Sequence, residues 1–139
     1  MADIELTDNT KLFLSAYGKA LHNGLEAIGM TAETYAKENI TDNDSVDTGR
    51  LRNSITHAIS GEKANISTYS DDEGNTYSYS GTAPNDKQPA VYIGTNVEYA
   101  PYVELGTSRQ KAQPFLKPAE TDHADEYRRI LKAALDSAK

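Results

Sequence analysis

The fold is decided by residues 10–40, which read TKLFLSAYGKALHNGLEAIGMTAETYAKENI. Apolar side chains recur there every three or four residues, the spacing that places them on one side of an α-helix. They are Leu14, Tyr17, Leu21, Leu25, Ile28, Ala32 and Tyr35. The segment predicts a long helix whose apolar stripe faces the core of its own domain or, as the alternative, forms a seam with another molecule.

Two features modify this helix. Residues 8–10 offer side chains that can cap its first turn. Gly18, Gly24 and Gly29 interrupt it, and each costs up to about 1 kcal/mol relative to alanine inside a helix. We therefore expect a bend or a break near Gly29 and Met30.

Beyond the helix, a polar loop over residues 41–48 leads to Asp47 or Thr48, either of which can cap a short turn. From residue 55 the apolar period changes to two, which is typical of strands. Four short strands are predicted near residues 55–59, 66–70, 77–79 and 91–93. The first two connections are short enough for hairpins, so we expect an antiparallel meander.

The last third of the chain predicts helices again. Pro101 can begin a short helix within residues 99–106 and Gly106 can end it. A polar loop with Arg109 and Lys111 follows, and residues 119–138 place acids early and bases late, as a helix favours. We predict one α+β domain over residues 1–139, with a long N-terminal helix and a C-terminal helix packed on a small antiparallel β-meander sheet.

Composition excludes several classes of site. The chain has 139 residues and no cysteine, which rules out disulfides, thiol nucleophiles and cysteine-ligated metals. Its 14 basic and 21 acidic residues give a net charge of −7, so nucleic acid and anionic lipid should be repelled. The longest apolar run is far short of the ~18 residues of a membrane span. We expect a soluble protein without an export signal and without a membrane partner.

Residues for catalysis or for metal binding are hard to assemble. His22, His57 and His123 have no second ligand at metal-site spacing, and we expect them to be packed or surface side chains. The acidic turn over residues 71–75 misses the calcium-loop spacing. Three basic pairs, at residues 50 and 52, 109 and 111, and 128 and 129, lack the interleaved aromatics of a single-strand groove. We predict no catalytic residue, no metal and no cofactor.

Three segments carry a more specific pattern. They are VDTGRLRNSI at residues 46–55, YAPYVELGT at residues 99–107 and QPFLKPA at residues 113–119. In this order they resemble the neck and tail-completion proteins of long-tailed bacteriophages. The resemblance covers roughly residues 10–138 and implies a non-catalytic virion protein of the head–tail junction, which joins or finishes the tail as a ring around the DNA channel.

The resemblance also implies where copies meet. Candidates for a subunit or partner interface are the residues that match the family pattern, namely Thr48, Gly49, Leu51, Arg52, Ser54, Tyr99, Tyr102, Glu104, Gly106, Thr107, Pro114 and Phe115. Aromatic members of this set can each bury about 150–200 Å² at a contact, or can belong to the core of the subunit instead.

Partners and location follow from the same resemblance. The expected partners are further copies in a ring, which in such phages is a hexamer, with a head-completion protein on one side and a tail-terminator or tail-tube protein on the other. Genomic DNA passes through without specific binding. The expected location is the virion neck or tail, after assembly in the host cytoplasm. The alternatives are a non-catalytic protein-binding module of similar fold and, less favoured, an enzyme.

Overall fold

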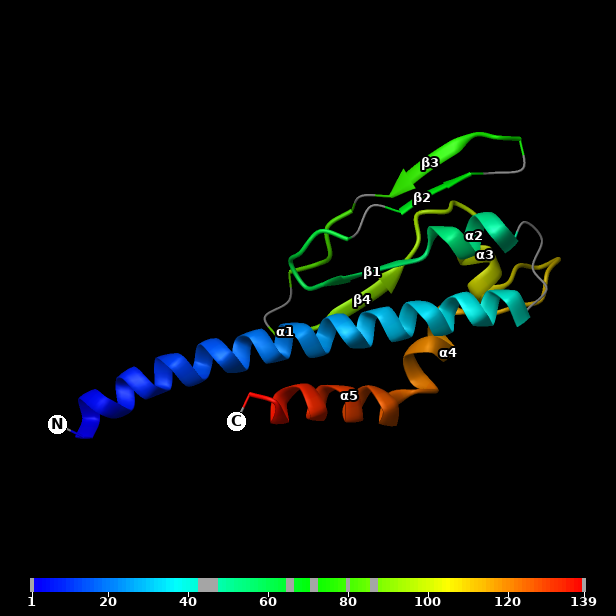
Figure 1. The fold of residues 1–139 in the computed structure, drawn as a ribbon. Helices are drawn as coiled ribbons and strands as arrows, with labels where there is room; N and C mark the ends of the chain where they lie inside the picture. The colour runs from blue at the N-terminus through cyan, green and yellow to red at the C-terminus, as the bar shows by residue number, and fades with distance from the viewer. Residues whose placement is uncertain are drawn as a thin grey trace.

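The computed structural model describes residues 2–42, 48–64, 67–70, 73–79, 81–85 and 88–138. The chain begins with α1 (Ala2–Asp42) and α2 (Thr48–Ser54). Four strands follow, β1 (Thr56–Ile59), β2 (Ser67–Ser70), β3 (Thr76–Tyr79) and β4 (Val91–Gly94). It closes with α3 (Ala100–Leu105), α4 (Leu116–Thr121) and α5 (Ala124–Asp136), as Figure 1 shows. The expectations at Asp47, Ile66 and residues 71–72 lie outside the described residues.

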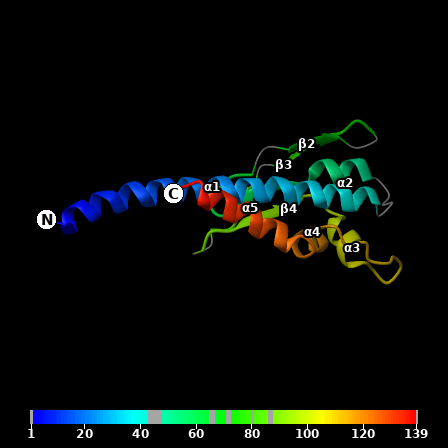
Figure 2. The same cartoon turned by 60° about the horizontal axis from the view of Figure 1, so that its bottom comes forward.

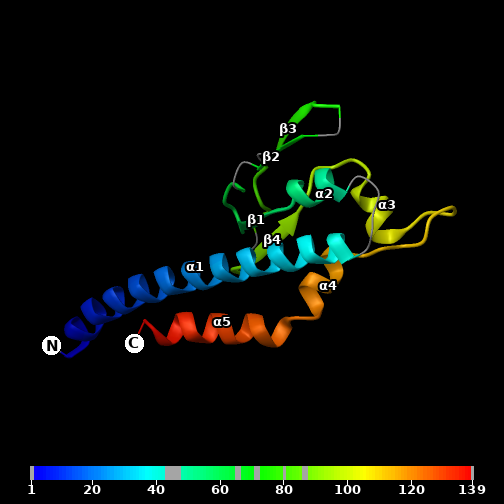
Figure 3. The same cartoon turned by 45° about the vertical axis from the view of Figure 1, so that its right-hand side comes forward.

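The predicted α+β class is confirmed, with its long N-terminal and C-terminal helices on small antiparallel sheets. In Figures 1 and 3 the β1–β4 sheet lies along one side of α1 and α5 runs along another. Ile40, Leu51, Ile55 and Phe115 are completely or almost completely buried where these layers meet. Burial of such side chains contributes roughly 1.5–3 kcal/mol each, which holds the helices against the sheet.

The first helix is longer than predicted and is not broken at Gly29, where it continues through Met30. Glycine is required at this position because a larger side chain would clash with the β1–β4 sheet. A Cβ at Gly29 would lie 2.5 Å from Cδ2 of His57 and 2.8 Å from Cγ2 of Val91. The absent side chain therefore lets the β1–β4 sheet approach α1 closely, and the packing offsets the helix-propensity cost of glycine.

The apolar stripe of α1 faces the core of its own subunit over the middle of the helix. Leu25, Ile28 and Ala32 are buried, and Leu21 and Tyr35 are half-buried. Tyr17 is exposed, and the side chain of Leu14 lies outside the described part. The stripe thus serves as a core-facing surface from about residue 20 onwards.

The strands pair in an order that differs from the predicted meander. Two separate two-stranded sheets form, β1 with β4 and β2 with β3. Both are antiparallel, with Thr56 opposite Gly94 in one sheet and Ser70 opposite Thr76 in the other. All four residues of β1 are buried. A buried strand favours an apolar partner, and β4 (VYIG) is more apolar than β2 (STYS), which follows β1 in the sequence.

The C-terminal segment is two helices and not one. The prediction of a continuous helix over residues 119–138 is wrong because α4 ends at Thr121 and α5 begins at Ala124. Tyr127 of α5 donates its hydroxyl to the carbonyl of Ala119, and the ring of His123 stacks on Tyr35 at 3.5 Å. These contacts fix the angle between α4 and α5 at residues 122–123. Burial raises the pKa of Tyr127 to about 12.

The short helix predicted at residues 99–106 is confirmed as α3, with Pro101 in its first turn. Gly106 follows it with φ of +79°, a conformation that favours glycine. Within the described ranges, no helix combines the length and the apolar character needed to cross a membrane.

Candidate subunit interface

The three sequence blocks meet in space. The first forms α2 and leads into β1, the second contains α3, and the third leads into α4. Each block contributes buried side chains to one apolar cluster, among them Leu51, Val103, Phe115 and Ala119. The first block, at residues 46–55, therefore builds one core with the second and third blocks, at residues 99–107 and 113–119.

Arg50 ties the first block to the second. Its Nη1 and Nη2 donate to the two carboxylate oxygens of Glu98 at 3.1 and 2.8 Å. The guanidinium also lies over the rings of Tyr77 and Tyr99, at 4.4 and 5.4 Å from their centroids. The hydrogen bonds to Glu98 raise the pKa of Arg50. A bidentate, stacked arginine of this kind holds a fixed geometry that lysine does not reproduce.

A hydroxyl connects the first block to residues 95–97, which precede the second block. Ser54 donates its hydroxyl to the carbonyl of Leu51 at 2.6 Å and shares a hydrogen bond with Thr95. Thr95 in turn accepts from the backbone amide of Val97 at 3.1 Å. Ser54 is fully buried, so its hydroxyl serves the interior of the chain.

Glu104 ties the second block to the third. Its carboxylate accepts from the backbone amides of Phe115 at 3.1 Å, Leu116 at 2.8 Å and Lys117 at 3.2 Å. These amides open α4 and have no carbonyl partner within that helix. A carboxylate at a helix start also interacts favourably with the helix dipole. Glu104 is thus a capping residue supplied from another helix.

The loop between α3 and α4 has a defined conformation, which a tight glycine turn and internal hydrogen bonds hold. A Cβ at Gly106 would lie 2.7 Å from the backbone nitrogen of Ala112, so only glycine fits this turn. Thr107 accepts with its hydroxyl from the amides of Arg109 and Gln110, and Gln113 donates its amide to the carbonyl of Val103 at 2.7 Å. The loop returns to α3 and presents Arg109 and Lys111 to solvent.

The predicted interface residues divide by exposure. Leu51, Ser54 and Phe115 are buried inside the subunit, where they cannot reach a neighbouring copy without unfolding. Tyr99, Glu104 and Gly106 are half-buried and are used as described above. The exposed members are Gly49, Arg52, Tyr102, Thr107 and Pro114. Thr48 lies in α2, and its side-chain environment is outside the described part.

The sequence prediction of interface residues did not include Leu105, an exposed residue of α3. Leu105 is 77% exposed, and the neighbouring Tyr102 is 58% exposed. The signal was available in the sequence, because successive residues of a helix are 100° apart and the core-facing side of α3 is taken by Ala100 and Val103. A six-residue helix cannot bury Tyr102, Val103 and Leu105 on one side. We define the α3 surface as Tyr102, Leu105, Arg109 and Lys111.

A groove of about 790 Å³ adjoins the α3 surface. Leu105 and Leu116 provide apolar walls, and the charged lining consists of Glu104, Lys117 and Glu120. Three successive residues of β4, residues 91–93, also line it. Because alternate strand residues point to opposite faces, a groove that touches all three runs along the edge of the strand.

The histidines lie apart from this groove. His57 is buried and bonds both ring nitrogens to α1, to Glu26 at 2.7 Å and to Glu33 at 3.3 Å. The hydrogen bond to Glu33 is the main cause that raises the pKa of His57. His22 contacts Glu62 at 3.1 Å, near the solvent. Among the described residues, no group of three His, Cys, Asp or Glu side chains has the arrangement of a metal site.

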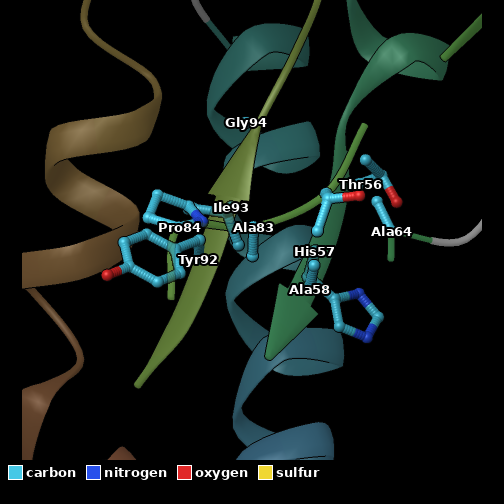
Figure 4. A pocket seen from close by; sticks show the side chains of 10 residues that line it. Thr56, His57, Ala58, Ala64, Ala83, Pro84, Tyr92, Ile93 and Gly94 are labelled. Atoms are coloured by element: carbon cyan, nitrogen blue, oxygen red, sulfur yellow. The ribbon is translucent and has the colours of Figure 1, made fainter. Parts of the chain in front are cut away.

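A smaller hollow, of about 220 Å³, lies beside β1 and β4 (Figure 4). Small side chains such as those of Ala58, Ala64 and Ala83 line much of it. Figure 4 shows Tyr92 extending from β4 away from β1, and the imidazole of His57 on the other strand. Among the described residues that line this hollow, none carries a carboxylate.

No protein-family model, no curated protein and no solved structure matches this chain.

Proposed function

We propose that this chain is a structural protein of the phage head–tail junction, which completes the tail or joins it to the head as a ring around the DNA channel. The observation that carries the proposal is the set of three tail-completion blocks, present in order and built into one core through Arg50 and Glu104.

Two further properties support this proposal. The α3 surface places a tyrosine and a leucine in solvent beside a groove, and large exposed apolar side chains mark contact sites in assemblies. The net charge of −7 would keep DNA phosphates from adhering as the genome passes. The expected neighbours are a head-completion protein and a tail-terminator or tail-tube protein, and the expected location is the virion neck.

Electron microscopy of particles that lack the protein tests the proposal. In the phage that encodes the chain, loss of the protein should give full heads and separate tails. Normally joined, infectious virions would contradict it. Light scattering of the purified chain separates this function from the alternative of a binding module outside the virion, because a junction protein should form rings with increasing concentration and a module should stay monomeric.

A further inference from the structure

The imidazole of His57 joins the β1–β4 sheet to α1. Figures 1, 2 and 3 show β4 beside the middle of α1. Nε2 of His57 lies 2.7 Å from a carboxylate oxygen of Glu26, and Nδ1 lies 3.3 Å from one of Glu33. The side chain of His57 is 4% exposed, whereas those of Glu26 and Glu33 are 40% and 22% exposed. A buried ring therefore lies between two acids that are about two turns apart on the same side of α1.

This arrangement favours one protonation state of the ring. An ionised carboxylate only accepts hydrogen bonds, and a neutral imidazole donates from one nitrogen and accepts at the other. A neutral ring would therefore place a lone pair against one of the two carboxylates. Only an imidazolium, which donates from both nitrogens, satisfies Glu26 and Glu33 together. The hydrogen bonds to Glu33 and Glu26 raise the pKa of His57, against burial, which acts to lower it.

Few other charges reach the ring. Lys37 of α1 donates to the other carboxylate oxygen of Glu33 at 3.5 Å and so shares that carboxylate with His57. β4 contains no charged residue and places Ile93 opposite His57. Glu62, which follows β1, contacts another histidine. The described residues that line the smaller hollow are uncharged apart from His57 itself. The two glutamates of α1 thus dominate the electrostatics of the ring.

The sheet is held on α1 away from the main apolar cluster of the chain. All four residues of β1 are buried, yet none of them belongs to the cluster around Phe115. Ile28 and Ala32 of α1 are also buried outside it. A segment opens locally at a lower free energy where fewer apolar contacts hold it. The charged hydrogen bonds of His57 therefore carry a large share of the attachment of β1 to α1.

We propose that His57 is a pH-dependent latch: as an imidazolium it holds the β1–β4 sheet on α1 at neutral pH, and after loss of one ring proton to solvent it lets the sheet open locally. The neutral ring keeps a single donor, so one half-buried carboxylate loses its imidazole partner. Because β4 residues 91–93 line the groove beside the α3 surface, the latch also fixes one wall of that groove. The latch is a property of the folded chain and is independent of the proposed head–tail function.

Nuclear magnetic resonance of the imidazole nitrogens tests the protonation state. At about pH 7 both ring nitrogens of His57 should have the chemical shifts of protonated nitrogens, and titration to higher pH should convert one of them to a bare nitrogen. The His57→Gln variant identifies the signals, because it removes them and leaves those of His22 and His123. A neutral ring of His57 at about pH 7 would overturn the latch.

Hydrogen exchange in increasing urea tests the release of the sheet. After correction for the intrinsic exchange rate, the amides of β1 and β4 should be about tenfold less protected above the titration of His57 than below it, because one charged hydrogen bond is lost. Above the titration these amides should exchange through an opening that depends only weakly on urea, since little surface is exposed. Exchange of β1 and β4 only with the urea dependence of global unfolding would overturn the latch.

A pair of charge-removing variants links the two measurements. Glu26→Gln keeps an acceptor but removes one charge beside the ring, so the His57 titration and the opening of β1 and β4 should both move to lower pH. Glu38→Gln is the matched control, because Glu38 is an exposed carboxylate on the same helix. It should leave both nearly unchanged. If the two variants shift the titration equally, or if neither shifts it, Glu26 does not hold the ring and the latch is refuted.

Discussion

Replacement of Glu104 gives the sharpest test of how the sequence blocks are joined. Its carboxylate accepts three backbone amides at the start of α4, from Phe115, Leu116 and Lys117. A hydrogen bond to a charged group contributes about 1.5–3 kcal/mol when it is well buried. Because Glu104 is only half-buried, we take about 1 kcal/mol for each bond, so Glu104→Ala should lower the free energy of unfolding by about 3 kcal/mol.

The loss should be visible in both chemical and thermal unfolding. For a domain of this size, 1 kcal/mol corresponds to roughly 2–4 °C in Tm, so Glu104→Ala should melt about 6–12 °C lower. Glu104→Gln keeps a carbonyl oxygen that can accept from two of the amides, but it loses the charge. The glutamine variant should therefore lose about half as much unfolding free energy as Glu104→Ala. Urea titration followed by circular dichroism measures the three free energies.

Glu120→Ala is the matched control, because Glu120 is an exposed carboxylate on α4, the helix that Glu104 caps. It should change the free energy of unfolding by less than about 0.5 kcal/mol. If Glu104→Ala unfolds within that margin of the wild type, or if glutamine is as harmful as alanine, then the carboxylate does not cap α4 in the way described.

Three further predictions follow from other parts of the chain. Gly29→Ala should lower the free energy of unfolding by about 1–3 kcal/mol in urea titration, because the added Cβ would clash with His57 and Val91. Gly18→Ala is the control: a Cβ there has no neighbour within 4 Å, so this variant should raise the free energy of unfolding by up to about 1 kcal/mol. Equal effects of the two substitutions would refute the close approach of the β1–β4 sheet to α1. Stability should also depend on pH through His57 and Glu33. Hydrogen bonds to Glu33 and Glu26 raise the pKa of His57, so its contribution is present below the unfolded value of 6.5 and is lost as pH rises through the folded pKa. Burial acts to raise the pKa of Glu33, but His57 and Lys37 together lower it, so its contribution is present above 4.5 and is lost as pH falls. The joint contribution should therefore be greatest between about pH 4.5 and 6.5, and His57→Gln should remove the decline on the alkaline side; an unchanged profile would contradict this assignment. Finally, the wild-type chain should not retain double-stranded DNA in a filter assay at about 0.15 M salt, and retention that falls steeply with added salt would contradict the repulsion expected from its charge.

Much of the candidate interface could not be predicted from the sequence. The pattern predicted Glu104 and Phe115 as interface candidates, but it did not predict that they contact each other within one chain. A motif indicates that positions matter and leaves open whether they serve the core or a partner. Leu105 lay within the quoted motif and was overlooked, although the short length of α3 already required an exposed side.

The sequence by itself determined the helices of α1, α3 and the C-terminal region, the α+β class and the absence of cysteine chemistry. Local spacing and turn residues specify these features, because they depend on contacts within a few residues along the chain. Only the tertiary structure decided that β1 pairs with β4, that the helix is unbroken at Gly29, and that the C-terminal segment turns at residues 122–123. Each of these depends on atoms from distant segments, such as His57 against Gly29 and His123 against Tyr35, whose packing energy outweighs local preference.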